Sequence, residues 1–115
     1  MAKKKKETRI KNEKDRLLRL FAGIDENKRE TVMSLIERAA FITVSLEDLE
    51  SDLIENGWTE DYNNGQHQSG KKKSAAADAH ISLTKNLTAI TKQLLDLVPA
   101  SQKADAISEL AAMFE

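Results

Sequence analysis

The sequence contains no cysteine, one proline, four glycines and only 4% aromatic residues. The lack of cysteine excludes disulfides, thiolate nucleophiles and cysteine-ligated zinc. A core with so few aromatic side chains has to be built from aliphatic residues, and the scarcity of helix breakers favours long helices. No segment approaches the ~18 apolar residues of a membrane span, and the N-terminus lacks the apolar run of a secretory signal. We therefore expect a helical protein that does not contact a membrane.

Apolar spacing predicts two long helices packed as an antiparallel hairpin. Within residues 25–56 and 74–98, apolar residues recur at alternating intervals of three and four, which is the a/d pattern of a coiled coil. The a/d residues are Val32, Leu35, Ala39, Ile42, Leu46, Leu49 and Leu53 in the first segment, and Ala76, His80, Leu83, Leu87, Ile90, Leu94 and Leu97 in the second. The polar segment 58–73 between them is predicted to be a loop.

Glycines and polar residues mark the ends of these helices. Gly23 is expected to end a first helix over residues 7–22, and Gly57 to end the second, with Trp58 folding back on Leu53. Side-chain caps are expected from Asp25 for the second helix, from Ser74 for the third and from Ser101 for a short last helix.

The expected fold is therefore all-α, with three regions. Residues 1–24 form a basic tail and helix, 25–99 form the central coiled-coil-like hairpin with its loop at 58–73, and 100–115 form a short C-terminal helix. A thin aliphatic core of this size is commonly completed by oligomerisation.

Apolar residues outside the a/d pattern of the second helix also favour an oligomer. A single hairpin cannot cover both faces of one helix. We expect the first helix to cover part of this surplus and neighbouring subunits to cover the rest. The predicted oligomer interface is Ile36, Ala40, Phe41, Val44 and Ile54.

Charge is strongly segregated along the chain although the formal net charge is only −1. Residues 1–20 carry a formal net charge of +6, and residues 25–61 carry −8. A basic end on an acidic body is typical of a segment that meets a polyanion. The predicted phosphate-contacting residues are Lys3, Lys4, Lys5, Lys6, Arg9, Lys11, Lys14, Arg16 and Arg19. The alternative is a tail that only keeps the protein soluble.

A second basic cluster, Lys71 to Lys73, precedes the helix predicted to begin after Ser74. Together with the helix dipole it could hold a phosphate, although an ordinary solvated loop fits equally well. We include these three lysines among the candidate DNA-binding residues.

Motifs that would indicate catalysis are missing from the sequence. There is no HExxH, no GxSxG and no complete Walker A sequence. Of the two histidines, His67 lies in the polar segment and His80 is better interpreted as a polar a/d residue than as a ligand. We expect no enzymatic activity, no metal site and no cofactor.

Several short segments resemble the terminase small subunits of tailed bacteriophages. They are Leu35-Ile-Glu-Arg-Ala-Ala-Phe, Leu46-Glu-Asp-Leu-Glu, Glu55-Asn-Gly, Tyr62-Asn-Asn-Gly, Lys72-Lys-Ser-Ala and Gln93-Leu-Leu-Asp-Leu-Val-Pro. The resemblance extends in order and spacing over residues 8–106. The chain departs from the family pattern at Ser74-Ala75, which lacks a proline, and at Asp96, which replaces a glycine.

The resemblance implies a non-enzymatic viral DNA-packaging factor acting in the host cytoplasm. Such subunits form ring-shaped homo-oligomers around a helical hairpin, bind the packaging-initiation region of double-stranded viral DNA, and recruit or regulate the large terminase subunit, which carries the ATPase and nuclease. Carried over to this chain, the basic residues of the first helix and its tail would contact DNA. Residues 111–115 would dock the large subunit, or alternatively Leu110, Met113 and Phe114 would pack inside the oligomer. The alternatives are a small helical DNA-binding regulator, acting as a dimer, and a coiled-coil adaptor.

Overall fold

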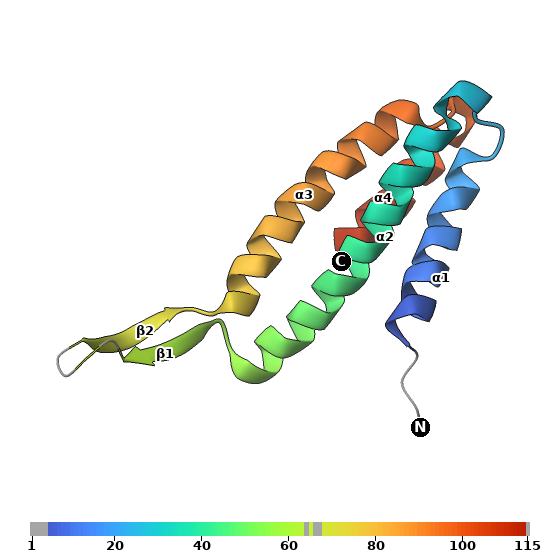
Figure 1. Ribbon diagram of the computed structural model, residues 1–115. Coiled ribbons are helices and arrows are strands. Elements are labelled where there is room, and N and C mark those ends of the chain that lie inside the picture. Colours follow the sequence, from blue (N-terminus) through green and yellow to red (C-terminus); the bar gives the residue numbers. More distant parts are fainter. Residues whose placement is uncertain (1–4, 64, 66–67, 115) are drawn as a thin grey trace.

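The structure is a computed structural model that describes residues 5–63, 65 and 68–114. The chain forms an elongated helical bundle of 63 × 35 × 23 Å with a small β-hairpin at one end (Figure 1). In chain order the elements are α1 (Lys6–Leu18), η1 (Arg19–Phe21), α2 (Glu26–Asn56), β1 (Thr59–Asn63), β2 (Ser69–Lys73), α3 (Ala75–Leu97), η2 (Ala100–Gln102), α4 (Lys103–Ala111) and η3 (Ala112–Phe114), where η denotes a 3₁₀ turn.

Helix α2 is the central element of the bundle. Helices α1 and α3 run along two of its sides, and α4 lies behind it in the view of Figure 1. The five consecutive residues 42–46 of α2 are all buried, which requires neighbours around its whole circumference at this level. The apolar core joins side chains from every helix, including Leu17 of α1, Ile36 of α2, Leu87 of α3 and Leu110 of α4.

The predicted α2–α3 hairpin is confirmed, and so is the predominantly helical class. All fourteen predicted a/d residues are buried or half-buried. Ser74 caps α3, because its hydroxyl accepts a hydrogen bond from the backbone N–H of Ala77 at 3.1 Å. Gly57 ends α2 with φ of +83°, a conformation that favours glycine, and its N–H donates to the carbonyl of Leu53. Trp58 lies edge-on against the imidazole of His80, with 5.6 Å between ring centroids.

Two of the predicted side-chain caps are wrong. Asp25 is the residue before α2, but its side chain makes no capping hydrogen bond. Ser101 lies inside the turn η2, and the residue that precedes α4 is Gln102. Gly23 is at the predicted stop, with φ of +82°, after α1 has tightened into η1.

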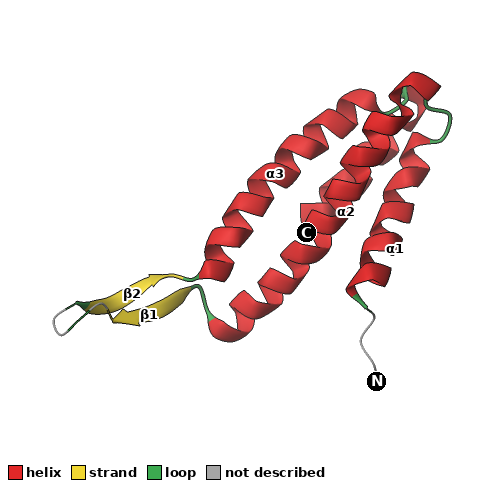
Figure 2. Cartoon of the chain, in the orientation of Figure 1, coloured by secondary structure: helices red, strands yellow, loops and turns green. Residues whose placement is uncertain are grey.

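The prediction of a loop over residues 58–73, and with it the all-α class in its strict form, is wrong. Strands β1 and β2 pair antiparallel from Thr59 opposite Lys73 to Asn63 opposite Ser69, and they project beyond the helices (Figure 2). Every described residue of both strands is exposed, so no apolar alternation marks them in the sequence. Tyr62 packs over Gly70, where an added Cβ would lie 3.3 Å from its ring.

Candidate nucleic-acid interface

Helix α1 carries five of the twelve predicted DNA-binding residues, and Lys5 and Arg19 flank it. None of residues 5–16 is buried, whereas Leu17 is 0% exposed and joins the core. The following turn adds the buried Leu20 and Phe21. The helix is therefore anchored at its C-terminal end and lies on the surface along the rest of its length. Lys3 and Lys4 are outside the described residues.

Three of the basic residues of α1 are paired with carboxylates of α2. Arg9 donates a hydrogen bond from Nη1 to Oδ1 of Asp48 at 2.7 Å, and its Nη2 lies 3.8 Å from Glu47. Lys6 lies 3.6 Å from the same Asp48. Further along, Lys14 lies 3.3 Å from Glu37. The basic face of α1 is thus turned in part toward the acidic face of α2.

The Arg9–Asp48 pair changes the titration of both groups. The hydrogen bond from Arg9 holds the pKa of Asp48 below its usual value of 3.8, against a smaller opposing effect of desolvation. The same bond raises the pKa of Arg9. Both side chains are partly exposed, so the pair is screened by solvent and contributes little to stability.

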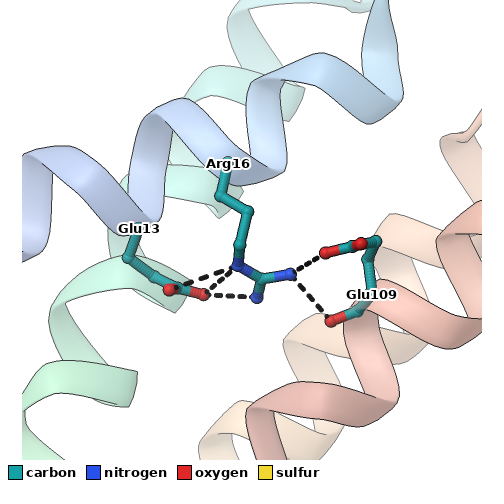
Figure 3. A network of polar contacts seen from close by, with 3 residues as sticks. All are labelled: Glu13, Arg16 and Glu109. Atoms are coloured by element: carbon teal, nitrogen blue, oxygen red, sulfur yellow. Dashed lines mark hydrogen bonds and ion pairs between the residues drawn. The ribbon is translucent and has the colours of Figure 1, made fainter.

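Arg16 joins α1 to α4 rather than to α2 (Figure 3). Its guanidinium binds the carboxylate of Glu13 one turn earlier, and it also binds both the carboxylate and the backbone carbonyl of Glu109. The hydrogen bond to Glu13 is the main cause of the raised pKa of Arg16. With a side chain only 23% exposed, Arg16 is a structural link between helices and is poorly placed to bind DNA.

The remaining basic residues of α1 point to solvent. Lys5 and Arg19 are exposed at the two ends of the helix. Lys11 is 73% exposed and pairs only within its own helix, with Asp15 at 2.8 Å. This pair raises the pKa of Lys11 and lowers that of Asp15, in both cases chiefly through their hydrogen bond. Lys5, Lys11 and Arg19 are therefore the described cations of this region that are exposed and not tied to another helix, and they are called open here.

The second predicted cluster lies on β2 and is also paired. The antiparallel register puts Lys71 opposite Asp61 and Lys72 opposite Glu60, with N–O distances of 3.0 and 3.4 Å. Lys73 lies 3.5 Å from Asp78 in the first turn of α3. Lys71 and Lys72 stabilise the hairpin through cross-strand pairs, and Lys73 pairs with α3, which weakens the case for a phosphate site before α3.

The predicted oligomer interface is divided by the structure. Ile36, Ala40 and Val44 are at most 2% exposed within the single chain, so the prediction that they face another subunit is wrong for this conformation. The physical reason is that α2 is already enclosed at this level by the other helices of the same chain. Phe41 and Ile54 are 51% and 87% exposed and remain open to a partner.

A cavity of about 340 Å³ lies between α1, α2 and α4. Its lining includes Arg16, Glu47, Glu109 and Thr43, whose buried hydroxyl has no hydrogen-bond partner among the described residues. The charged groups of this lining are engaged with other side chains: Arg16 with Glu13 and Glu109, Glu47 with Arg9, and Glu50 with His80. Across residues 5–63, 65 and 68–114 there is no group of three or more side chains arranged to hold a metal ion.

His80 is the one a/d residue with a charged partner across the hairpin. Its Nε2 lies 2.9 Å from the carboxylate of Glu50 on α2. Together with the Trp58 ring, this contact closes the end of the helical hairpin where the strands leave it. The arrangement favours the structural interpretation of His80 over a ligand role.

Sequence patterns did not reveal that the basic and acidic segments pair with each other. The available signal was their opposite charge on two helices joined by a short turn, because antiparallel contact between such helices brings the opposite charges together. Within the described part of the chain, no helix is both long and apolar enough to cross a membrane.

Comparison with family models, with curated proteins and with solved structures finds no match for this chain.

Proposed function

We propose that this chain is a non-catalytic DNA-binding assembly protein of the terminase small-subunit type. In this proposal it oligomerises into a ring, binds the packaging-initiation region of double-stranded viral DNA, and recruits or regulates the large terminase subunit. The observation that carries the DNA-binding part is the basic helix α1, which lies on the outside of the bundle without a buried residue from 5 to 16. The viral part rests on the sequence resemblance.

Phosphate contact requires cations that duplex DNA can reach without disrupting the fold. Lys5, Lys11 and Arg19 meet this requirement in the described conformation. Lys3 and Lys4 precede them in the sequence and add to the local positive charge. Binding through such residues is independent of base sequence and falls steeply with salt, because each neutralised phosphate releases counterions.

Oligomerisation is supported by apolar side chains that the single chain leaves uncovered. Phe41, Ile54, Ile107 and Phe114 are each 46–87% exposed. They come from α2, α4 and the last turn, so a partner would meet the bundle along more than one helix. The same set includes Phe114, which lies in the segment expected to dock the large subunit. Contact with another copy of the chain and contact with the large subunit would therefore exclude each other at Phe114.

Two measurements test this proposal. Light scattering coupled to size-exclusion chromatography, at low and high salt, gives the mass of the particle. A discrete species well above a tetramer is expected, and a monomer or dimer under all conditions contradicts the ring. Fluorescence anisotropy with a labelled duplex then measures DNA binding.

The binding measurement has a matched control. We expect the triple variant Lys5→Gln, Lys11→Gln and Arg19→Gln to weaken duplex binding by at least about tenfold at low salt, because three phosphate contacts are lost. The control variant Lys28→Gln, Lys85→Gln and Lys92→Gln removes the same charge from exposed positions of α2 and α3. Equal losses in both variants would mean that only total charge matters.

A coiled-coil adaptor remains the second candidate, and the ion pairs favour it. Carboxylates of α2 bind Lys6, Arg9 and Lys14. Cross-strand carboxylates bind Lys71 and Lys72. In an adaptor the basic residues would serve only to make these ion pairs within the chain. Absence of duplex binding by the unmodified protein would select this candidate.

A further inference from the structure

The attachment of α1 to the bundle is of two different kinds along its length. At its C-terminal end, Leu17, Leu20 and Phe21 are at most 5% exposed and belong to the core. Over residues 6–14 no side chain is buried. Burial of apolar surface is the main interaction that fixes one helix against another. The C-terminal end of α1 is therefore firmly held, whereas the N-terminal half depends on other contacts.

The polar contacts between the N-terminal half and α2 are ionic, and Ile10 is the one apolar residue of this stretch, half-buried. They link Lys6 and Arg9 to Asp48, Arg9 to Glu47, and Lys14 to Glu37, at 2.7–3.8 Å. The ammonium of Lys6 also lies 5.2 Å from the centre of the half-exposed Phe41 ring. The three carboxylates are 45–58% exposed, so water and salt screen these pairs.

The cations in these pairs are of the type that duplex phosphates bind, and an N–H group that donates to a carboxylate of α2 is not available to a phosphate at the same time. A duplex brought to the exposed Lys5 and Lys11 would place phosphates beside the paired residues of the same helix. Exchange of a carboxylate for a phosphate conserves the number of ion pairs. The free-energy difference between the two arrangements is therefore small, so that DNA can shift the equilibrium between them.

We propose that the acidic face of α2 is an internal competitor for DNA. In the free protein Glu37, Glu47 and Asp48 hold the basic face of α1. In the complex, phosphates replace them, and the N-terminal half of α1 moves away from α2 about its apolar anchor at Leu17. This inference rests on the proposed function, since it concerns the regulation of the same DNA-binding helix.

The competition gives the chain a way to disfavour weak binding to short polyanions. Only a polyanion with enough closely spaced phosphates to replace several carboxylates at once can open the helix. Single phosphates or nucleotides offer too few contacts. We therefore expect the affinity to increase with duplex length more strongly than it would if only the three open cations bound phosphates.

Neutralising the competitor tests this directly. The variant Glu47→Gln with Asp48→Asn is expected to bind a labelled duplex about three- to tenfold more tightly than the unmodified protein at low salt, because each exposed ion pair is worth up to about a fivefold factor. The matched control is Asp52→Asn with Glu55→Gln, which changes the net charge equally on exposed positions of the same helix. Its affinity is expected to change less than about twofold.

Displacement of α1 is measured separately, and the absence of native cysteine makes labelling simple. Spin labels on Thr8→Cys and Ser51→Cys, both at exposed positions of α1 and α2, report the distance between the two helices. DNA is expected to lengthen and broaden this distance. The Glu47→Gln, Asp48→Asn variant is expected to show part of the same change without DNA.

The outcomes separate this inference from the proposed function. If the unmodified protein binds duplex DNA while the label distance stays unchanged, the inference is overturned and DNA binding stands. The inference is also overturned if both carboxylate variants gain the same affinity, because the effect would then be one of net charge. If the unmodified protein does not bind duplex DNA at all, both proposals fail together.

Discussion

The two kinds of attachment of α1 predict that two substitutions in this helix lower the free energy of unfolding by very different amounts. Leu17→Ala removes the only fully buried side chain of α1, which is 0% exposed. Replacement of a buried leucine by alanine costs about 2–5 kcal/mol, because apolar contact is lost and a cavity remains. Arg9→Gln removes two ion pairs with partly exposed partners, and such pairs are worth about 0.2–1 kcal/mol.

Urea unfolding followed by far-ultraviolet circular dichroism measures both costs. With a slope of roughly 1–3 kcal/mol per molar urea, a loss of about 3 kcal/mol lowers the midpoint by roughly 1–3 M. Leu17→Ala is expected to show such a shift, and Arg9→Gln is expected to show a clearly smaller shift at the same slope. The measurement is made at several protein concentrations, because association adds to apparent stability. Equal shifts for the two variants would refute the view that α1 is fixed at one end and ionically held at the other.

Three further substitutions test local features. Ser74→Ala removes the side-chain cap of α3 and is expected to cost about 1 kcal/mol, measured by thermal unfolding, with Ser74→Gly costing only a few tenths. Gly57→Ala is expected to cost about 1–3 kcal/mol by the same assay; no heavy atom lies within 4 Å of the added Cβ, so the cost is backbone strain alone. Asp48→Asn is expected to lower the melting temperature by a few degrees at pH 6 and not at all well below pH 3.8, because the stabilisation from a carboxylate with a lowered pKa is lost as the pH falls through that pKa. A difference that persists at acid pH would contradict the ion-pair explanation.

The helical hairpin was predictable because its signal is periodic and redundant. Seven a/d positions in each helix agree on the same packing face, so no single residue decides the result. Helix ends were predictable where the backbone adopts a positive φ that favours glycine, as at Gly57 and Gly23. They were less predictable where a side chain only has the option of capping, as at Asp25 and Ser101.

The β-hairpin was missed because its stability comes from pairs rather than from periodicity. Its strands have no buried face, and they are held by backbone bonds, by pairs such as Glu60 with Lys72, and by Tyr62 over Gly70. A sequence read position by position shows only a polar stretch with a lysine run. The register that places opposite charges across from each other becomes visible only when two strands are considered together.

The candidate site was predictable in composition and not in arrangement. Counting charges identifies α1 as basic, but it does not show that Arg16 binds α4 or that Arg9 binds α2. The oligomer interface failed at Ile36 and Val44 for a related reason. Apolar surplus on a helix shows that something must cover it, and the sequence leaves open whether the cover is the same chain or another one.

Salt dependence of duplex binding by the unmodified protein tests the central claim most directly. The logarithm of the association constant is measured by anisotropy against the logarithm of salt concentration, with a duplex long enough to span α1 and its lysine run. Each phosphate contact contributes a slope of about −0.9, so contacts from at least four cations predict a slope of about −4 or steeper. A slope between 0 and about −1, or no binding at about 50 mM salt, would contradict a DNA-binding role for α1.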